Sequence, residues 1–426
     1  MSGLTIGVIG GGSIFTPELA ELLGRSTDVL GPIDLRLMDV DLGRLDVVAG
    51  LCRRIVEGAD DLVTISTGDS SEAAIEGADF VLVQFRVGGA DARIRDDRLG
   101  LKYRIPFVET VSVCGFAAFL RSAFELERIA DQVRRLAPDA WVMEFANPAG
   151  MLAELLSRLG CERVVGVCNS SIVVRDGLAR ALGASPNELV LNWRGLNHLT
   201  CVDAVLWQGR DVYAEAIARL AETPHPYLPF PPAFLELAGF LPSYYLRYHF
   251  FAREVVDELQ ARPTTRAEEV KAVNARLLDA YRIADSVPDG LRERGGYGYS
   301  RAVVDVILGL RTGDGSIHYL SVPNGSTLPE LPADGFVEVP VRAIDGELRA
   351  VPVPPLPELA RGVIEPMKRY ETTLIAAARA RDREGLLRTL MLHPLIGDYG
   401  VAEPILRDVL EQNAAFLPEE LAGPDG

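Results

Sequence analysis

The stretch that decides the fold is Leu4-Thr-Ile-Gly-Val-Ile-Gly10-Gly-Gly-Ser-Ile-Phe15-Thr-Pro-Glu, close to the N-terminus. Its first residues form an apolar, β-branched run typical of a strand, and a helical pattern follows the glycines. A glycine-rich turn from strand to helix places backbone N–H groups at the positive end of the helix, where a pyrophosphate can bind. We therefore expect the N–H groups of Gly11, Gly12 and Ser13 to face such a group.

An acidic residue further along strengthens this prediction. Phe15 replaces the third glycine of the usual G-x-G-x-x-G pattern, so the turn alone could serve packing only. However, Asp39 ends the next apolar run, 27 residues after Gly12. A carboxylate there accepts hydrogen bonds from the adenosine ribose and repels a 2′-phosphate, which favours NAD over NADP. The expected cofactor contacts are Gly10, Gly11, Gly12, Ser13, Ile14, Phe15, Asp39 and Arg86.

Around this turn, the first 170 residues alternate short β-branched runs with amphipathic helical stretches. This alternation is typical of a parallel sheet wrapped by helices, and the right-handed crossover rule then gives a doubly wound sheet. The predicted strands are Thr5–Ile9, Asp34–Met38, Leu62–Ser66, Phe80–Phe85, Ala140–Phe145 and Val164–Val167. Beyond about residue 189 the pattern mixes strands with helices. We expect a Rossmann-type NAD-binding domain over 1–190, an α+β substrate and metal domain over 191–418 and a loose tail over 419–426.

Composition excludes several classes of protein. The net charge of −17 opposes binding to nucleic acid. No apolar run approaches the ~18 residues of a membrane span, and no signal peptide is apparent, so we expect a cytoplasmic protein without membrane contact. Five cysteines, an odd number without CxxC spacing, argue against a disulfide framework or a zinc ribbon.

Four apolar runs end in polar residues where a doubly wound sheet binds its ligands. Taken singly, each could have a purely structural role, as a core cysteine, a buried histidine or a turn. Together they predict an active site, in which Cys168 and His198 could share one divalent ion and leave positions for substrate oxygens. The soft thiolate ligand favours zinc, whereas a site completed by sugar oxygens also suits manganese, cobalt, nickel or iron. The four runs end at Gln84–Gly89, Glu144–Pro148, Val167–Asn169 and Gly195–Leu199.

The ordered motifs resemble glycoside hydrolase family 4, the NAD- and manganese-dependent glycosidases, nearly from end to end. The closest likeness is to the 6-phospho-β-glucosidase branch. The motifs are Gly10-Gly-Gly-Ser-Ile-Phe-Thr-Pro-Glu-Leu, Phe85-Arg-Val-Gly-Gly, Glu109-Thr110, Asn147-Pro-Ala-Gly, Gly166-Val-Cys-Asn169, Gly195-Leu-Asn-His-Leu, Tyr245-Leu-Arg-Tyr248, Arg294-Gly-Gly-Tyr-Gly-Tyr299 and His393-Pro-Leu.

The resemblance implies a C-terminal domain like that of lactate and malate dehydrogenases and a redox-elimination route. NAD oxidises the sugar at C3, a base removes the C2 proton, the C1–O bond breaks and water adds. By motif, Cys168 and His198 match the metal ligands. Tyr245 matches the base of the β-cleaving branch and Tyr299 lies in the segment that holds the base of the α-cleaving branch. The remaining expected residues are Glu109, which orients or activates the base, and Arg93, Asn147, Asn169 and Arg266, which contact the substrate.

Departures from the family pattern bear on the substrate. Asn169 stands where α-cleaving members carry an aspartate proton donor, which favours β-linked substrates. Ser112 and Cys114 replace glycines of the pattern Glu-Thr-x-Gly-x-Gly-Gly, so we expect a reshaped pocket. Glu268 and Glu269 beside Arg266 leave it open whether a sugar 6-phosphate is bound.

Several alternatives stay open at this point. They are the same mechanism on a non-phosphorylated or α-linked glycoside, a 2-hydroxy-acid dehydrogenase, and a non-catalytic NAD-binding protein. The partner expected from the resemblance is a small-molecule glycoside, and the assembly a homodimer or homotetramer.

Overall fold

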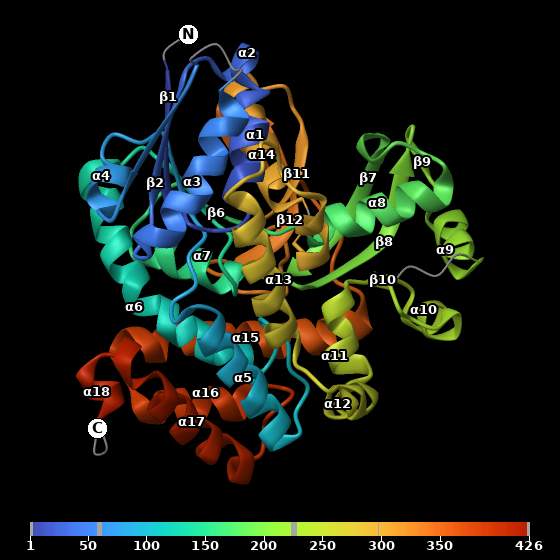
Figure 1. Ribbon diagram of the computed structural model, residues 1–426. Helices are drawn as coiled ribbons and strands as arrows, with labels where there is room; N and C mark the ends of the chain where they lie inside the picture. Colours follow the sequence, from blue (N-terminus) through green and yellow to red (C-terminus); the bar gives the residue numbers. More distant parts are fainter. Residues whose placement is uncertain (1–2, 58–61, 223–227, 297, 424–426) are drawn as a thin grey trace.

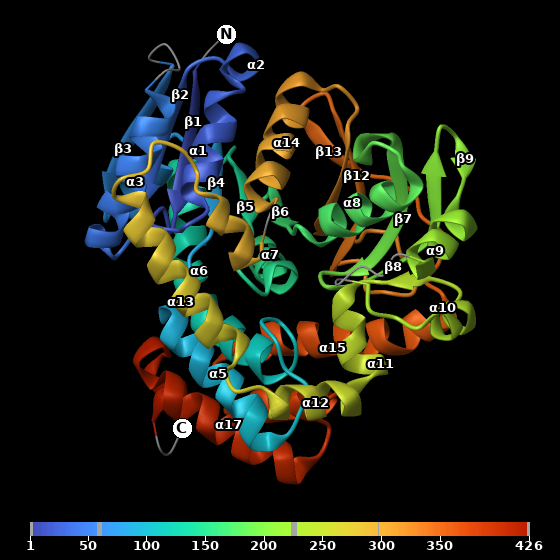
Figure 2. The ribbon, with the colours of Figure 1, turned by 45° about the vertical axis from the view of Figure 1, so that its right-hand side comes forward.

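The computed structural model describes residues 3–57, 62–222, 228–296 and 298–423. Within them, all strands join one sheet of thirteen. Figure 2 shows this sheet with β1–β3 at one end and β7–β9 at the other. The strands are β1 (Leu4–Ile9), β2 (Ile33–Met38), β3 (Val63–Gly68), β4 (Phe80–Val83), β5 (Trp141–Glu144), β6 (Val164–Val167), β7 (Leu189–Leu196), β8 (Leu199–Trp207), β9 (Arg210–Asp211), β10 (Leu241–Pro242), β11 (Ile317–Pro323), β12 (Phe336–Ile344) and β13 (Glu347–Ala350).

The N-terminal part is a parallel sheet in the order β3-β2-β1-β4-β5-β6. This is the strand order of the doubly wound dinucleotide-binding fold, in which ligands bind where the order reverses, next to β1 and β4. The expected doubly wound sheet is therefore confirmed. The helices of this part are α1 (Thr16–Gly24), α2 (Thr27–Leu30), α3 (Leu42–Val56), α4 (Ser71–Ile75), α5 (Gly89–Tyr103), α6 (Val113–Leu136), α7 (Ala149–Arg158) and α8 (Ser170–Leu182).

The remaining strands extend the same sheet in antiparallel fashion. Strand β11 pairs with β6 on one side and with β12 on the other, and β12 pairs in turn with β7. The helices of this part are α9 (Tyr213–Glu222), α10 (Pro232–Ala238), α11 (Arg247–Phe250), α12 (Ala252–Ala261), α13 (Arg266–Tyr281), α14 (Tyr299–Thr312), α15 (Glu358–Ala380), α16 (Arg383–Leu392), α17 (Tyr399–Asn413) and α18 (Glu419–Ala422), with 3₁₀ turns η1 (Pro186–Glu188), η2 (Tyr244–Leu246), η3 (Asp289–Arg294) and η4 (Ala414–Phe416).

The chain returns to its N-terminal half at the end. Helices α15–α17, drawn in orange to red in Figure 1, lie beside α5 and α6. One hydrophobic core runs from Leu4 on β1 to Leu421 on α18, across the expected division at residue 190. That division stays a prediction, because the sheet and this core are both continuous through it.

The C-terminus and the cysteines can be compared with expectation directly. The tail expected to be loose over 419–426 begins with helix α18, where Leu421 is fully buried, and residues 424–426 lie outside the described residues. The apolar side chain of Leu421 anchors this turn against the core.

All five cysteines are free and buried, which agrees with the expectation that the chain has no disulfide framework. Over the described ranges, no helix is both long and apolar enough to cross a membrane.

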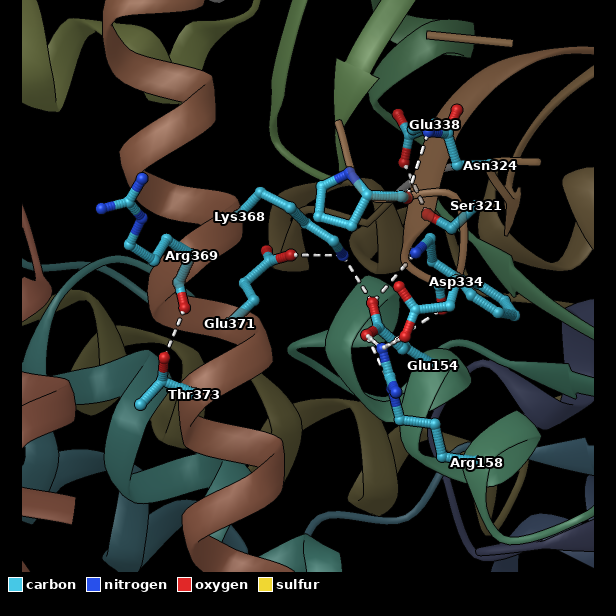
Figure 3. Close-up of polar contacts among 12 residues, drawn as sticks. Glu154, Arg158, Ser321, Asn324, Asp334, Glu338, Lys368, Arg369, Glu371 and Thr373 are labelled. Atoms are coloured by element: carbon cyan, nitrogen blue, oxygen red, sulfur yellow. Dashed lines mark hydrogen bonds and ion pairs between the residues drawn. The ribbon is translucent and has the colours of Figure 1, made fainter. Parts of the chain in front are cut away.

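A buried ion network ties α7 to α15 and to the start of β12 (Figure 3). The Lys368 Nζ atom lies 2.5 Å from Glu154 Oε2 and 3.0 Å from Glu371 Oε2, and the lysine is 1% exposed. Glu154 also accepts the backbone N–H of Phe336 at 2.9 Å and pairs with Arg158. Removing one member of such a group leaves buried charge unpaired, which is far more costly than losing an exposed pair.

We predict that Lys368→Met strongly destabilises the protein, because Glu154 and Glu371 would remain buried without their cation. The expected loss is about 3–5 kcal/mol, measured as a lower thermal midpoint and a lower urea midpoint. Lys271→Met is the matched control. Lys271 Nζ also lies 2.5 Å from a carboxylate, that of Asp91, but both side chains are more than half exposed. Its loss should cost less than about 1 kcal/mol, and equal effects of the two substitutions would contradict the argument.

Candidate active site

A cavity of about 1750 Å³ lies at the carboxyl ends of β1, β4, β5 and β6. Although the chain carries a net charge of −17, the described residues around this cavity include ten arginines and eight aspartates or glutamates. The lining thus reverses the overall sign of charge, which suits an anionic ligand. The expected site residues found there are Gly10, Ser13, Ile14, Phe15, Asp39, Arg86, Arg93, Glu109, Asn147, Asn169, Tyr245, Arg266 and Tyr299.

The glycine turn lies at the rim of this cavity, but its N–H groups do not face it as expected. Gly11 N–H donates to Met38 O at 2.7 Å, Gly12 N–H to Asp39 Oδ2 at 2.9 Å, and Ser13 N–H to Gly10 O at 3.1 Å. The turn therefore uses these donors to hold itself against β2. Among the described residues, none accepts from Ile14 N–H, which directly precedes Phe15, the N-cap residue of α1.

Glycine is required in the turn by close packing. A Cβ atom at Gly12 would lie 2.8 Å from Asp39 Oδ2, and one at Gly10, where φ is +94°, would lie 2.7 Å from Phe85 N. Asp39 thus has two tasks. One of its oxygens fixes the glycine turn, while the residue also lines the cavity at the end of β2. A side chain without a carboxylate here would leave the turn unsupported.

Glu109 is the most strongly paired carboxylate of the cavity. Its Oε1 atom lies 2.9 Å from Arg93 Nη1 and 3.8 Å from Arg86 Nη2. Burial opposes ionisation, but the charges of Arg93, Arg86 and then Arg294 outweigh it and lower the pKa of the carboxyl to about 2. Glu109 is therefore a permanent anion that orients its neighbours rather than an acid that donates protons.

Asn147 and Arg93, which line the cavity, each have a buried polar atom without a hydrogen-bond partner among the described residues. Asn147 donates through Nδ2 to Glu109 Oε2 at 3.4 Å, but its Oδ1 atom is buried and accepts from none of the described residues. The Nε atom of Arg93 is likewise buried without a described acceptor. A buried donor and a buried acceptor left unpaired are costly, so both are suited to bind ligand hydroxyls.

The imidazole of His198 lies flat against a tyrosine ring. The centroids of His198 and Tyr245 are 3.7 Å apart and their planes differ by 6°. On the other side, Thr110 Oγ1 lies 2.6 Å from His198 Nδ1 and fixes the orientation of the imidazole. Burial lowers the pKa of His198 to about 4, so the ring is neutral near pH 7, the form that binds metals.

Cys168 directly follows β6 and contacts the second tyrosine. Its Sγ atom lies 4.0 Å from Tyr299 Oη and 3.1 Å from Ser170 Oγ, and it accepts the backbone N–H of Ser170 at 3.4 Å. Tyr299 in turn packs between Phe15 of the glycine turn and Phe145. Cys168 and His198 do not themselves line the large cavity, but each contacts a tyrosine that does.

The residues present fit a metal site with two protein ligands. No group of three or more His, Cys, Asp or Glu side chains suited to hold a metal occurs within the described parts of the chain. A buried thiol and a neutral imidazole beside a cavity would leave the remaining positions to substrate oxygens and water, as in catalytic rather than structural sites.

Arginines at and near α13 form one wall of the cavity, and the sequence predicted only Arg266 among them as a site residue. Arg266 lines the cavity, donates to Arg294 O at 2.9 Å and pairs with Glu269 at 3.1 Å. Glu268 instead caps the N-terminus of α13 and pairs with Arg98, so only one of the two expected acidic neighbours weakens the positive charge of Arg266. Sequence reasoning missed three further arginines of this wall, which are Arg262, Arg292 and Arg294.

The two glycine replacements do not reshape the large cavity, contrary to expectation. Ser112 and Cys114 do not line it, because both point into the protein at the start of α6. The Cys114 thiol lies 3.6 Å from Asp97 Oδ1 in the interior. Position 115 retains the glycine of the family pattern, and a Cβ atom there would lie 2.1 Å from Thr110 O.

Glu338 is a supporting residue that the sequence did not reveal. This buried carboxylate accepts from Asn197 Nδ2 at 2.7 Å and from Trp193 Nε1 at 2.8 Å. Burial, and next the Cys168 thiol, raise the pKa of Glu338 to about 7. Asn197 directly precedes His198, so Glu338 fixes the segment that carries the histidine. Glu338 lies in the middle of β12, where no motif marks it.

Comparison with known proteins agrees with this geometry. The model of the family 4 glycosyl hydrolases matches residues 5–184, and the model of the family 4 glycosyl hydrolase C-terminal domain matches residues 193–396. A probable 6-phospho-β-glucosidase of Bacillus subtilis (strain 168) is 33% identical over 432 residues, which cover 98% of each chain.

Solved structures give the same result. A 6-phospho-β-glucosidase of Thermotoga maritima with NAD and glucose-6-phosphate superposes with a TM-score of 0.92 at 30% identity, over 98% of this chain and 99% of that chain. Its structure with manganese, NAD⁺ and glucose-6-phosphate gives a TM-score of 0.90 at 30% identity, over 97% and 99%. A malate dehydrogenase of Cryptosporidium parvum shares the fold alone, with a TM-score of 0.54 at 15% identity over 89% and 100%. The expected fold class and the expected family are both confirmed, and the chain belongs to the family 4 glycosyl hydrolases.

Proposed function

We propose that this enzyme hydrolyses 6-phospho-β-glucosides with NAD and a divalent metal, of which manganese is the first candidate. The observation that carries the proposal is the placement of Cys168 and His198 against Tyr299 and Tyr245, at the edge of an arginine-rich cavity. Relatives named as 6-phospho-β-glucosidases support the substrate, and a relative solved with manganese, NAD⁺ and glucose-6-phosphate supports the cofactors. Cobalt, nickel and iron fit the same ligands.

The positive wall of the cavity supports a phosphorylated sugar. Arg266 and Arg294 are joined through the Arg294 carbonyl, and Arg262 and Arg292 line the same cavity. Burial lowers the pKa of Arg294 to about 10, so it remains a cation at neutral pH. A phosphate group gains charge-assisted hydrogen bonds from such donors, which a neutral hydroxymethyl group cannot form.

The chain contributes five side chains to the chemistry. NAD bound here would accept a hydride from the sugar ring, and the metal would stabilise negative charge on the neighbouring sugar oxygens. Cys168 and His198 would hold the metal, while Asn147 and Arg93 would bind sugar hydroxyls through their unpaired atoms. Glu109 keeps Arg93 and Asn147 in place. Water addition needs no carboxylic acid on the protein, which agrees with an anionic Glu109.

Tyr245 is our candidate for the base that removes the C2 proton, with Tyr299 as its alternative. Burial raises the pKa of Tyr245 well above its usual value, and nearby Glu109, Tyr299 and Cys168 raise it further. A phenolate at Tyr245 therefore requires bound positive charge, which ties proton removal to the presence of the metal. Asn169, which lines the cavity beside Cys168, cannot donate a proton as an aspartate would, and this favours β-linked substrates.

Other expectations from the sequence stay predictions. The cytoplasmic location and the homodimer or homotetramer are among them. The roles of the glycine turn, Asp39 and Arg86 in holding NAD also belong here.

We predict that the protein cleaves nitrophenyl β-glucoside 6-phosphate at least about tenfold better than nitrophenyl β-glucoside, in kcat/KM, because the arginine wall binds phosphate. Cleavage should require both NAD and Mn²⁺, tested by omitting each from dialysed protein. Arg266→Gln should reduce the rate on the phosphorylated compound and leave the other compound nearly unaffected. Equal cleavage of both compounds by the wild type would instead indicate a non-phosphorylated substrate.

Cys168→Ser should lower Mn²⁺ affinity about 100-fold or more and abolish cleavage, because a hydroxyl is a poor ligand in place of a thiolate. NAD binding, followed by fluorescence titration, should remain. Cys201→Ser is the control, since Cys201 is also buried and its thiol donates to the backbone oxygen of Arg194. Unchanged activity in Cys168→Ser would reject the metal assignment.

Tyr245→Phe should lower kcat about 10²–10⁴-fold and stop incorporation of solvent deuterium at C2 of the released sugar, because the general base is lost. Tyr299→Phe should keep deuterium incorporation. Mass spectrometry of the sugar released by these two variants measures the deuterium at C2 and so decides which tyrosine is the base. The reverse pattern would assign the base to Tyr299, and incorporation by neither wild type nor variants would reject the elimination route.

A further inference from the structure

A second, small cavity lies behind His198, on the side of the imidazole that carries Nδ1. Its volume is about 20 Å³, enough for one water molecule. Several polar residues border it, together with apolar ones such as Val111 and Met151. The polar residues are Thr110, Ser112, Asn197, His198, His249 and Glu371.

Thr110 needs a further partner in this cavity. When Nε2 of His198 binds a metal ion, Nδ1 carries the ring proton and donates it to Thr110 Oγ1, 2.6 Å away. The threonine hydroxyl is then the acceptor, so its own proton must be donated elsewhere. No described residue accepts that proton, and the cavity is bordered by Thr110 itself.

Ser112 carries two costs that the protein does not offset. Its backbone has φ +59° and ψ −134°, a conformation that a Cβ atom makes unfavourable. Its Oγ atom is fully buried and has no hydrogen-bond partner among the described residues. Glycine would avoid both costs, and the family pattern has glycine here. A strained, unpaired serine that borders a water-sized cavity indicates that its hydroxyl binds something inside it.

Glu371 supplies a carboxylate acceptor beside this cavity. One of its oxygens pairs with Lys368 at 3.0 Å, as Figure 3 shows, and the residue also borders the small cavity. A water molecule there would meet a donor in Thr110, a hydroxyl in Ser112 and a carboxylate in Glu371. Three partners is the usual number for an internal water molecule.

Building on the proposed metal site, we propose that this cavity holds one ordered water molecule, which accepts the Thr110 proton and is fixed by Ser112 and Glu371. Ser112 is thereby a positioning residue for the metal centre. It acts on His198 through the water and Thr110, and it touches neither substrate nor metal. The replacement of glycine by serine in this chain trades stability for a better oriented ligand.

Two variants of Ser112 separate its hydroxyl from its Cβ atom. Ser112→Gly and Ser112→Ala both remove the hydroxyl, so both should weaken Mn²⁺ binding about 3–10-fold by calorimetry. Only glycine removes the Cβ strain, so Ser112→Gly should have a thermal midpoint about 2 °C or more above that of Ser112→Ala. A purely structural serine would make metal affinity follow the midpoint, and unchanged affinity in both variants would overturn the proposal.

Asp345→Gly provides the matched control for strain. Asp345 also has a positive φ, of +53°, but lies exposed in the turn between β12 and β13. This substitution should raise the midpoint without changing Mn²⁺ affinity.

Crystals of the metal-free protein test the water separately from the metal. Electron density for one water molecule beside Ser112, absent from Ser112→Gly crystals, is the expected result. A dry cavity in the wild type would overturn the inference whatever the metal titrations give. If the wild type has the water but binds no Mn²⁺, the proposed function fails and, with it, the positioning role of Ser112.

Discussion

The pairing of β6 with β11 is the constraint on which the active site depends. Parallel strands end there, and Val167 of β6 lies opposite Leu320 of the antiparallel β11. The next residue after Val167 is Cys168, so the cysteine is held where the two parts of the sheet meet. Through β12 the same sheet reaches β7, whose continuation carries His198. Two candidate ligands 30 residues apart are thus positioned by strands of one continuous, hydrogen-bonded sheet.

Much of the N-terminal half could be predicted from the sequence because its strands are short apolar or β-branched runs that alternate with amphipathic helices. In the second half, strands β11 and β12 were not predicted, because they carry paired polar residues inside. Glu338 interrupts the apolar pattern of β12, yet it is 1% exposed, since Trp193 and Asn197 donate to it. Ser321 does the same in β11. Such residues become compatible with a buried strand only when their partners are known, and the partners of Glu338 lie more than a hundred positions away in the sequence.

The residues of the candidate site also fall into those that the sequence could predict and those that it could not. Residues within motifs, such as Cys168, His198 and Asn147, could be named from the sequence, and the structure gathers them. The contact of Thr110 with His198 and the support of Asn197 by Glu338 join distant positions, and no local pattern encodes them. The hydrogen bonds of the glycine turn could not be predicted for another reason. Its sequence predicts where an anion binds but not that Asp39 already accepts from Gly12. Family membership removes the 2-hydroxy-acid dehydrogenase from the alternatives, although that fold is shared.

The reversal of charge between the cavity and the rest of the chain has a kinetic consequence. An anionic sugar phosphate approaches a molecule whose distant field is repulsive, and it meets attraction only within the cavity. Added salt screens the long-range repulsion over about 8–10 Å while it affects buried contacts far less. The rate of substrate entry therefore rises with ionic strength while the dissociation rate stays nearly constant, opposite to the behaviour of enzymes that attract their substrates from afar.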